Sequence, residues 1–207
     1  SGTLSFLIGH SKPAEKDPIS LRLEKIITLM GNPEKFFYCG KLGAGLAAKI
    51  SNNYLSCSIL LATAEAMAIG VKSGIDKQLL HDVIQNSSGR SWMADNVQPV
   101  PGVVPHAPSS NDYRLGFKTQ MMIKDLTLGV DAGRATGIYP SIAEAALRVY
   151  EKAAIDPRCI VSLKLRASMK CADARRIEMH LRFTSILATH RMNSQNIHSI
   201  QSNLGEV

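Results

Sequence analysis

The sequence predicts a mainly α protein, in which a small β-α-β unit precedes an all-helical domain. Two short apolar runs rich in β-forming residues, 3–8 and 35–39, flank one helical pattern over 18–30. No further strand-like run follows, and apolar residues then recur at helical spacing, beginning with a proline-free stretch over 45–73. We therefore expect three segments, a β-α-β unit, a helical domain and a divergent basic tail, at 1–42, 43–155 and 156–207.

The composition is that of a globular chain and excludes several classes of protein. Of the 207 residues, 45% are hydrophobic and 20% are charged, so the chain is neither disordered nor fibrous. Its 24 Lys and Arg against 17 Asp and Glu give a formal net charge of +7, but the basic residues are scattered rather than grouped in blocks. Aromatic residues make up only 5%, which argues against stacking platforms for nucleic acid. We expect no nucleic-acid partner.

The cysteines and the hydropathy pattern predict neither a metal centre nor a membrane span. Four cysteines, with no pair at CxxC spacing, indicate reduced thiols in an intracellular compartment and no metal site. By inspection, no apolar run reaches the ~18–20 residues that a membrane helix needs. The chain is therefore expected to be intracellular and to have no membrane partner.

Helix signals lie between the two predicted strands of the β-α-β unit. Asp17 has the side chain of an N-cap, Pro18 suits the first helical position, and residues 31–33 (Gly-Asn-Pro) are expected to end the helix. The unit has about the size of a single crossover. It is too small to fold as an independent domain, so we interpret it as the last piece of a larger α/β sheet.

The helical domain begins with one unusually long helix. Residues 45–73 are rich in Ala, Leu and Ile, and their apolar positions wrap most of the circumference, so we expect this helix to be buried on several sides. An ordered loop that contains four prolines is expected over 99–113. The remaining helices are expected at 77–85, 91–97, 118–136 and 140–154.

The start of the long helix carries a glycine motif that admits two interpretations. Residues 43–48 (Gly-Ala-Gly-Leu-Ala-Ala) follow a strand, open a helix and fit the G-x-G-x-x-[GA] fingerprint of dinucleotide sites. Glu65 lies near the distance expected of the ribose-binding acid of such sites. That acid must end the next strand, however, whereas Glu65 lies within an uninterrupted helical run. The fingerprint interpretation is therefore disfavoured.

The second interpretation is a catalytic site at the helix start. Lys49 and Asn53 are four residues apart and share one face of the helix, and Gly43 and Gly45 allow close approach of the backbone. An ammonium beside an amide, both facing a cleft, can hold a proton at an alcohol oxygen and bind a carboxylate. In the alternative, Lys49 extends into solvent, and Asn52 and Asn53 are ordinary residues of a polar face. The chemistry of these residues alone leaves both possibilities open.

The residues around this helix start follow the pattern G-x-G-x-x-x-K-x-x-N-N, with Gly43, Gly45, Lys49, Asn52 and Asn53 in its specified positions. The pattern resembles the catalytic signature of the β-hydroxyacid dehydrogenases, in particular the 3-hydroxyisobutyrate dehydrogenase type. Further motifs of that family follow in order: GTLSF at 2–6, TAEA at 63–66, SSGRSW at 87–92, NVQPVPG at 96–102, Phe117, and KDL at 124–126. The resemblance implies an all-α domain like the C-terminal domain of 6-phosphogluconate dehydrogenase, preceded by a remnant of a Rossmann domain.

The same resemblance implies an NAD- or NADP-dependent oxidation of a small 3-hydroxy acid. Lys49 would be the catalytic acid or base, which exchanges a proton with the substrate oxygen. Asn53, together with Gly45 and Asn52, would bind the substrate. These roles come from the family and not from the spacing of the residues.

The family also implies roles for the segment that carries the KDL motif. Lys124 would contact the cofactor, and Phe117 would lie on the nicotinamide side. Asp125 is expected to fix the local helix rather than to touch the substrate. The resemblance implies no metal ion.

The sequence departs from the family in two ways. The 207 residues hold no second glycine fingerprint and no Ser-Gly-Gly substrate loop, which the family carries before the GTL strand, and 156–207 do not resemble the family's end. We therefore expect these residues alone to be inactive as a dehydrogenase. The alternative function is a non-catalytic assembly module, because domains of this kind pair in the family. In either case we expect a homo-oligomer, located in mitochondria if the source is eukaryotic and in the cytoplasm otherwise.

Overall fold

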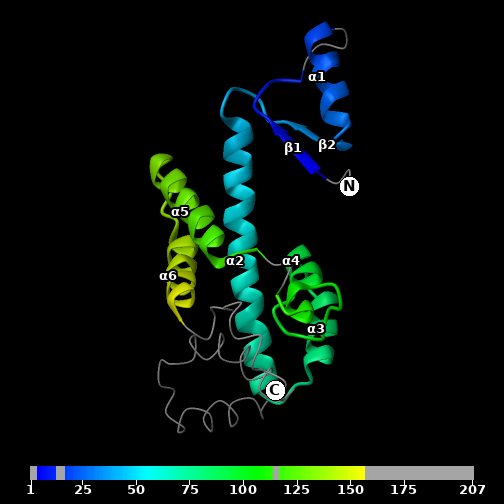
Figure 1. The fold of residues 1–207 in the computed structure, drawn as a ribbon. Coiled ribbons are helices and arrows are strands. Elements are labelled where there is room, and N and C mark those ends of the chain that lie inside the picture. Colours follow the sequence, from blue (N-terminus) through cyan, green and yellow to red (C-terminus); the bar gives the residue numbers. More distant parts are fainter. Residues whose placement is uncertain (1–3, 13–16, 114–116, 157–207) are drawn as a thin grey trace, which may run out of the picture.

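The computed structural model describes residues 4–12, 17–113 and 117–156 of the chain (Figure 1). Its β-α-β unit consists of β1 (Leu4–Ile8), α1 (Pro18–Thr28) and β2 (Gly31–Tyr38). Its helical part consists of α2 (Ala44–Lys72), α3 (Lys77–Gln85), α4 (Trp92–Asn96), the 3-10 helix η1 (Pro108–Asn111), α5 (Thr119–Ala135) and α6 (Ser141–Ile155). The predicted order of strands and α-helices is confirmed. The predicted basic tail lies outside the described residues from 157 onward.

The β-α-β unit has the predicted topology, since β1 and β2 pair in parallel and α1 connects them. The backbone N–H of Ser20 donates to the Asp17 carboxylate at 3.0 Å, which confirms Asp17 as the N-cap of α1. The second strand starts earlier than predicted, at Gly31 rather than residue 35. Gly31 pairs with Leu4, and a side chain there would collide with the ring of Phe6, so the missing side chain lets the strand begin at this point.

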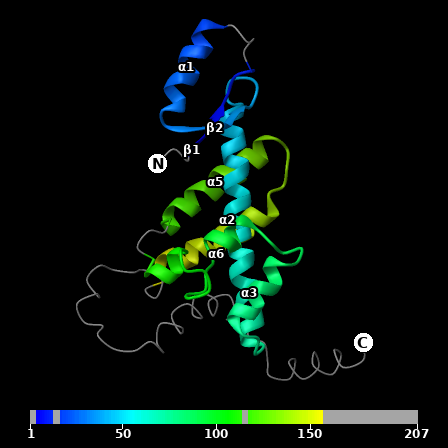
Figure 2. The same cartoon turned by 90° about the vertical axis from the view of Figure 1, so that its right-hand side faces the viewer.

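The long helix α2 forms the axis of the molecule, and the other elements are arranged around it (Figures 1 and 2). The β-α-β unit lies at its N-terminal end, α5 and α6 pack along one side, and α3 and α4 lie against its C-terminal half. The main core lies between α2, α5 and α6. Its buried members are Cys57, Leu61, Leu126, Val130, Ala143, Ala146 and Tyr150.

Much of α2 remains exposed, contrary to the prediction that this helix is buried on several sides. Leu46, Leu55 and Ile69 are 61%, 57% and 69% exposed. The prediction was wrong because an apolar circumference shows which residues could be buried, whereas the neighbouring helices cover only part of it.

The same helix also corrects the expectation about membrane spans. Over its most apolar 18-residue window α2 has a mean hydropathy of 1.6, so by length and composition it could cross a membrane. Only 33% of that window is buried in the described chain. The core helix of a water-soluble protein meets the same criterion, so this property alone does not assign α2 to a membrane.

Candidate functional site

The glycine motif at the start of α2 is explained by packing. Gly45 is buried, and a Cβ atom on it would lie 2.9 Å from the carbonyl carbon of Leu7, 3.0 Å from the nitrogen of Gly9, and closer still to the Leu7 oxygen. The side-chain direction of this predicted substrate residue is therefore occupied by the backbone of β1. Gly43, at the N-cap, has a φ of 88°, which favours glycine.

One face of α2 contacts both the β-α-β unit and α3. Gly70, near the other end of the helix, would place a Cβ against the side chain of Leu80 in α3. Gly45 and Gly70 are 25 residues apart (70 − 45), about seven full helical turns, so they point in nearly the same direction. Lys49 and Asn52 are one and two turns beyond Gly45 and share this face.

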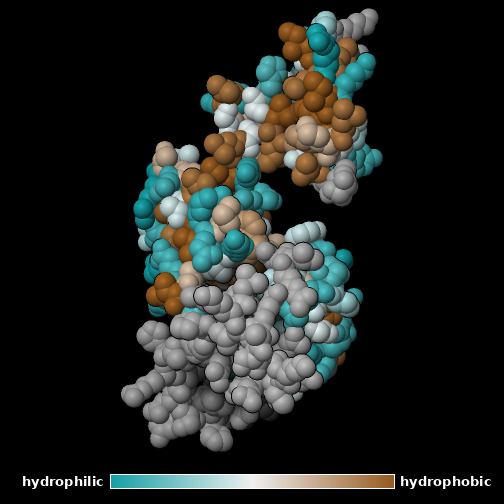
Figure 3. Space-filling view, in the orientation of Figure 1, coloured by the Kyte–Doolittle hydropathy of each residue, from teal (hydrophilic) through white to brown (hydrophobic). Residues whose placement is uncertain are grey.

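The surface is hollowed between these two contacts. Figure 3 shows an open notch between the β-α-β unit and the lobe formed by α3 and α4. By the periodicity of α2, the part of the helix that borders this notch carries Lys49, Asn52 and, toward α5, Asn53. Helical periodicity therefore puts the predicted lysine on the side of α2 that contacts both lobes, and its side chain is exposed rather than enclosed.

The predicted catalytic lysine is exposed and makes no hydrogen bond or ion pair with any residue in the described ranges. Asn52 is exposed as well, and its Nδ2 donates to Oδ1 of Asn53 over a long 3.4 Å. The amine of Lys49 is therefore available to a molecule that enters the notch.

A polar cluster around one buried carboxylate joins α2 to α5 next to this face. Nδ2 of Asn53 donates to Oδ2 of Asp125 at 3.0 Å, and Nζ of Lys124 lies 2.8 Å from Oδ1 of the same carboxylate. Asp125 is only 5% exposed, whereas the side chain of Lys124 is half exposed. Both carboxylate oxygens thus have a partner, as a buried charge requires.

The structure brings together some of the predicted site residues and leaves others apart. Asn53 and Lys124, predicted for substrate and cofactor, meet through Asp125, and Lys49 precedes Asn53 by one turn. Phe117 is 56% exposed and lies two residues before α5.

Asp125 pairs with Lys124 of its own helix, and it also links two helices, because its carboxylate accepts from Asn53 of α2. A signal was present in the sequence. Met122, Asp125 and Gly129 follow each other at helical spacing, and they place a carboxylate on the face of α5 that packs against α2.

The core beneath the cluster is apolar and keeps its thiol neutral. Burial, and after it the charge of Asp125, raises the pKa of Cys57 to about 11. The hydroxyl of Tyr150 donates to the backbone oxygen of Cys57 at 2.9 Å, and burial raises the pKa of this tyrosine too. Cys57 therefore contributes packing and is not a nucleophile near neutral pH.

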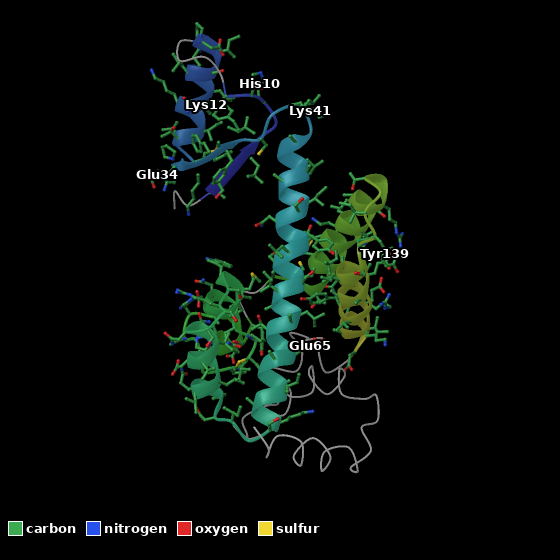
Figure 4. The ribbon with its side chains drawn as sticks, turned by 180° about the vertical axis from the view of Figure 1, so that it is seen from behind. His10, Lys12, Glu34, Lys41, Glu65 and Tyr139 are labelled. Atoms are coloured by element: carbon green, nitrogen blue, oxygen red, sulfur yellow. The ribbon has the colours of Figure 1, made fainter. Side chains whose placement is uncertain are left out.

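The glycine motif at the start of α2 lacks the strand that would carry a ribose-binding acid. Glu65 lies within uninterrupted α2, well along the helix in Figure 4, which confirms that the glycine motif is not a Rossmann fingerprint. The ring of Phe117 and half of the Lys124 side chain, the two predicted cofactor contacts, are exposed. The described ranges hold no cluster of metal ligands.

The structure places residues of the motif that resembles the β-hydroxyacid dehydrogenases on two packed helices, α2 and α5. A comparison with protein families agrees, because residues 43–157 match the family described as NAD-binding of NADP-dependent 3-hydroxyisobutyrate dehydrogenase. This match covers more than half of the 207 residues, and the chain belongs to this family.

Individual relatives carry related names. The mitochondrial 3-hydroxyisobutyrate dehydrogenase of Rattus norvegicus is 39% identical over 150 residues, which cover 72% of this chain and 43% of the relative. The NAD-dependent L-serine dehydrogenase of Pseudomonas aeruginosa is 36% identical over 150 residues, with coverages of 72% and 48%. The solved structure of Mycobacterium tuberculosis 3-hydroxyisobutyrate dehydrogenase with L-serine has a TM-score of 0.65 and 38% identity, and the match covers 74% of this chain and 50% of that one.

These comparisons confirm the predicted family and support the predicted class of cofactor, NAD or NADP. The structural match also agrees with a mostly helical fold that includes a small parallel sheet. The chain spans about half the length of the relatives that it matches.

Proposed function

We propose that the chain forms the helical domain of an NAD- or NADP-dependent dehydrogenase that oxidises a small 3-hydroxy acid, with Lys49 as catalytic acid or base. The observation that carries this proposal is the polar cluster across α2 and α5. It holds Asn53 and Lys124 together one turn from an exposed lysine at the edge of the notch.

The chemistry of these groups suits a small hydroxy acid. The Lys49 amine can take the proton of the substrate hydroxyl, or return it to a carbonyl oxygen in the reverse direction. The amide of Asn53 offers an oxygen acceptor and one N–H donor beyond its bond to Asp125, which can orient a hydroxyl or a carboxylate. A molecule of this size needs few contacts to be held.

The cofactor contacts are proposed for α5 and the residue before it. A nicotinamide dinucleotide, when bound, exchanges a hydride with the carbon that bears the hydroxyl. Lys124 would contact its polar groups through the exposed side of the ammonium, and the Phe117 ring would cover an apolar part and exclude water.

Substitutions of Lys49 test the proposal in the natural polypeptide that carries these residues. Lys49→Ala is expected to lower kcat with 3-hydroxyisobutyrate or L-serine by roughly 10²- to 10⁴-fold, the range of a lost acid or base. Lys49→Arg keeps the charge but cannot exchange the proton, so KM should change less than kcat. Lys72→Ala, an exposed lysine in the last turn of α2, is the matched control with wild-type rates. Unchanged kcat in Lys49→Ala would contradict the proposal.

We further propose that a polypeptide limited to the printed 207 residues is inactive. The affinity of such enzymes for a dinucleotide depends on a glycine-rich loop that binds its phosphates. The 207 residues contain one G-x-G-x-x-[GA] stretch, at 43–48, and its Gly45 packs against the backbone of β1. An assay of this polypeptide with either cofactor should show no reduction of NAD or NADP. Measurable turnover would show that such a loop is dispensable.

A second candidate function, assembly of a homo-oligomer, is favoured by an exposed stripe on α2. Ala48, Leu55, Ala62 and Ile69 follow each other at seven-residue intervals, and Leu55 and Ile69 are more than half exposed. Such spacing places them along one side of the helix, where a second copy could cover them. Sedimentation velocity should show a dimer, which Leu55→Lys with Ile69→Lys converts to a monomer. A wild-type monomer at micromolar concentration would rule out this assembly.

We also propose an intracellular location, mitochondrial if the source is eukaryotic, because the rat and Arabidopsis thaliana relatives carry that compartment in their names. Fractionation of the source cells tests this proposal. Recovery from the culture medium or the cell envelope would contradict it.

A further inference from the structure

We propose that Asp125 is a positioning residue, which sets the orientation of Asn53 and Lys124 at the site. This inference rests on the function proposed above. Its carboxylate is 5% exposed and lies where α5 packs against α2. Oδ2 accepts from Asn53 on α2 at 3.0 Å, and Oδ1 pairs with Lys124 at 2.8 Å. One buried group therefore determines the placement of two side chains from different helices.

The effect on Asn53 follows from the chemistry of the two side chains. An ionised carboxylate can only accept hydrogen bonds, so Asn53 must turn its NH₂ group toward Asp125. Its Oδ1 then points away from Asp125, on the side where Nδ2 of Asn52 lies 3.4 Å away. The site is thus provided with an amide oxygen of defined direction, which suits the O–H of a hydroxy acid.

The effect on Lys124 is to restrict a long side chain. Half of this side chain is exposed, and an unpaired lysine there would sample many rotamers. The ion pair with a buried carboxylate selects the conformations in which the ammonium lies against α5. The cofactor then meets a preordered cation rather than a mobile one.

A purely structural role, in which Asp125 only ties α2 to α5, makes a different prediction. The two helices already share an apolar core formed by Leu61, Leu126 and Val130. A simple tie would still join the helices with its partners exchanged, with the carboxylate on α2 and the amide on α5, although the ion pair of Lys124 is then lost. Positioning requires the amide on α2, because only that arrangement presents the Asn53 oxygen.

The test compares Asp125→Asn, the exchange Asn53→Asp with Asp125→Asn, and Glu144→Gln in the natural polypeptide. Asp125→Asn removes the charge at constant size, so the amide of Asn53 can turn either way. The exchange keeps a carboxylate–amide bond. Glu144→Gln is the control, because it removes the exposed 2.7 Å ion pair between Arg134 of α5 and Glu144 of α6. Three quantities are measured: kcat/KM for the hydroxy acid, the melting temperature, and hydrogen exchange of the Asn53 side-chain NH₂ by NMR without ligand.

Asp125→Asn is expected to lower kcat/KM by roughly 10²-fold, as for a misplaced group, and to speed exchange of the Asn53 NH₂. The exchanged pair should regain most of the melting temperature but not kcat/KM, and Glu144→Gln should keep wild-type kcat/KM. Recovery of kcat/KM in the exchanged pair, or wild-type kcat/KM in Asp125→Asn, would overturn the positioning role. The wild-type protein could fail to turn over hydroxy acids and still show slow hydrogen exchange of the Asn53 NH₂ that Asp125→Asn speeds up. That result would contradict the proposed function but support the positioning of Asn53 by Asp125.

Discussion

Replacement of Gly45 by alanine tests whether this glycine serves the contact between α2 and β1. The added Cβ would lie 2.9 Å from the carbonyl carbon of Leu7 and closer still to its oxygen, distances that Cβ atoms essentially never show, and a tight 3.0 Å from the nitrogen of Gly9. Both neighbours are backbone atoms of the strand and its exit loop, so relief requires that β1 move relative to α2. Overpacking of this kind costs about 1–3 kcal/mol.

The helix propensity of alanine opposes this cost by up to ~1 kcal/mol relative to glycine. The net effect of Gly45→Ala is therefore a loss of about 0–3 kcal/mol in the free energy of unfolding, with a central value of roughly 1–2 kcal/mol. For a chain of this size that central value corresponds to a fall of about 2–8 °C in melting temperature. Thermal unfolding followed by circular dichroism at 222 nm measures it.

Gly70→Ala is the matched control, on the same helix and the same face. Its Cβ also collides, but only with the side chain of Leu80, whose ends can rotate. We expect the melting temperature of Gly70→Ala to stay closer to that of the wild type. If the melting temperature of Gly45→Ala equals or exceeds that of Gly70→Ala, the packing explanation is refuted. Lost activity with an unchanged melting temperature would instead favour a role of Gly45 in binding substrate.

Three further predictions follow from the caps, the core and the buried thiol. The Asp76 carboxylate caps α3, because it accepts from the backbone N–H groups of Gln78 and Leu79 at 2.9 and 3.0 Å. Asp76→Ala should therefore lower the free energy of unfolding in urea by ~1 kcal/mol, and an unchanged midpoint would exclude this cap. Tyr150→Phe removes the 2.9 Å bond to Cys57 and should cost about 1 kcal/mol, which a wild-type midpoint would contradict. Because burial raises the pKa of Cys57 from 9.0 to about 11, the contribution of this thiol to stability should be constant below pH 9 and fall as the pH rises toward 11. Cys57→Ala should show a smaller fall, and an equal one would assign the effect to other groups.

The candidate site could be predicted from the sequence only where its residues lie on one element. The spacing of Lys49 and Asn53 placed both on one face of α2, because a helix repeats every ~3.6 residues. The family motif added Lys124 and Phe117. The link through Asp125 escaped prediction, since Asn53 and Asp125 are 72 residues apart and meet only because α2 packs on α5.

By itself the sequence determined the order and type of the described strands and α-helices, the cap at Asp17, and the family. These properties depend on local patterns, such as periodicity, capping side chains and motif spacing, which any stretch of chain carries with it. Only the tertiary structure decided that Gly45 packs against the backbone of β1 and that much of α2 stays exposed. It also decided that Asp125 of α5 accepts a hydrogen bond from Asn53 of α2. The physical reason is that burial and cross-helix bonds depend on which surfaces meet, and an apolar or charged residue has no preference among partners until the helices have packed.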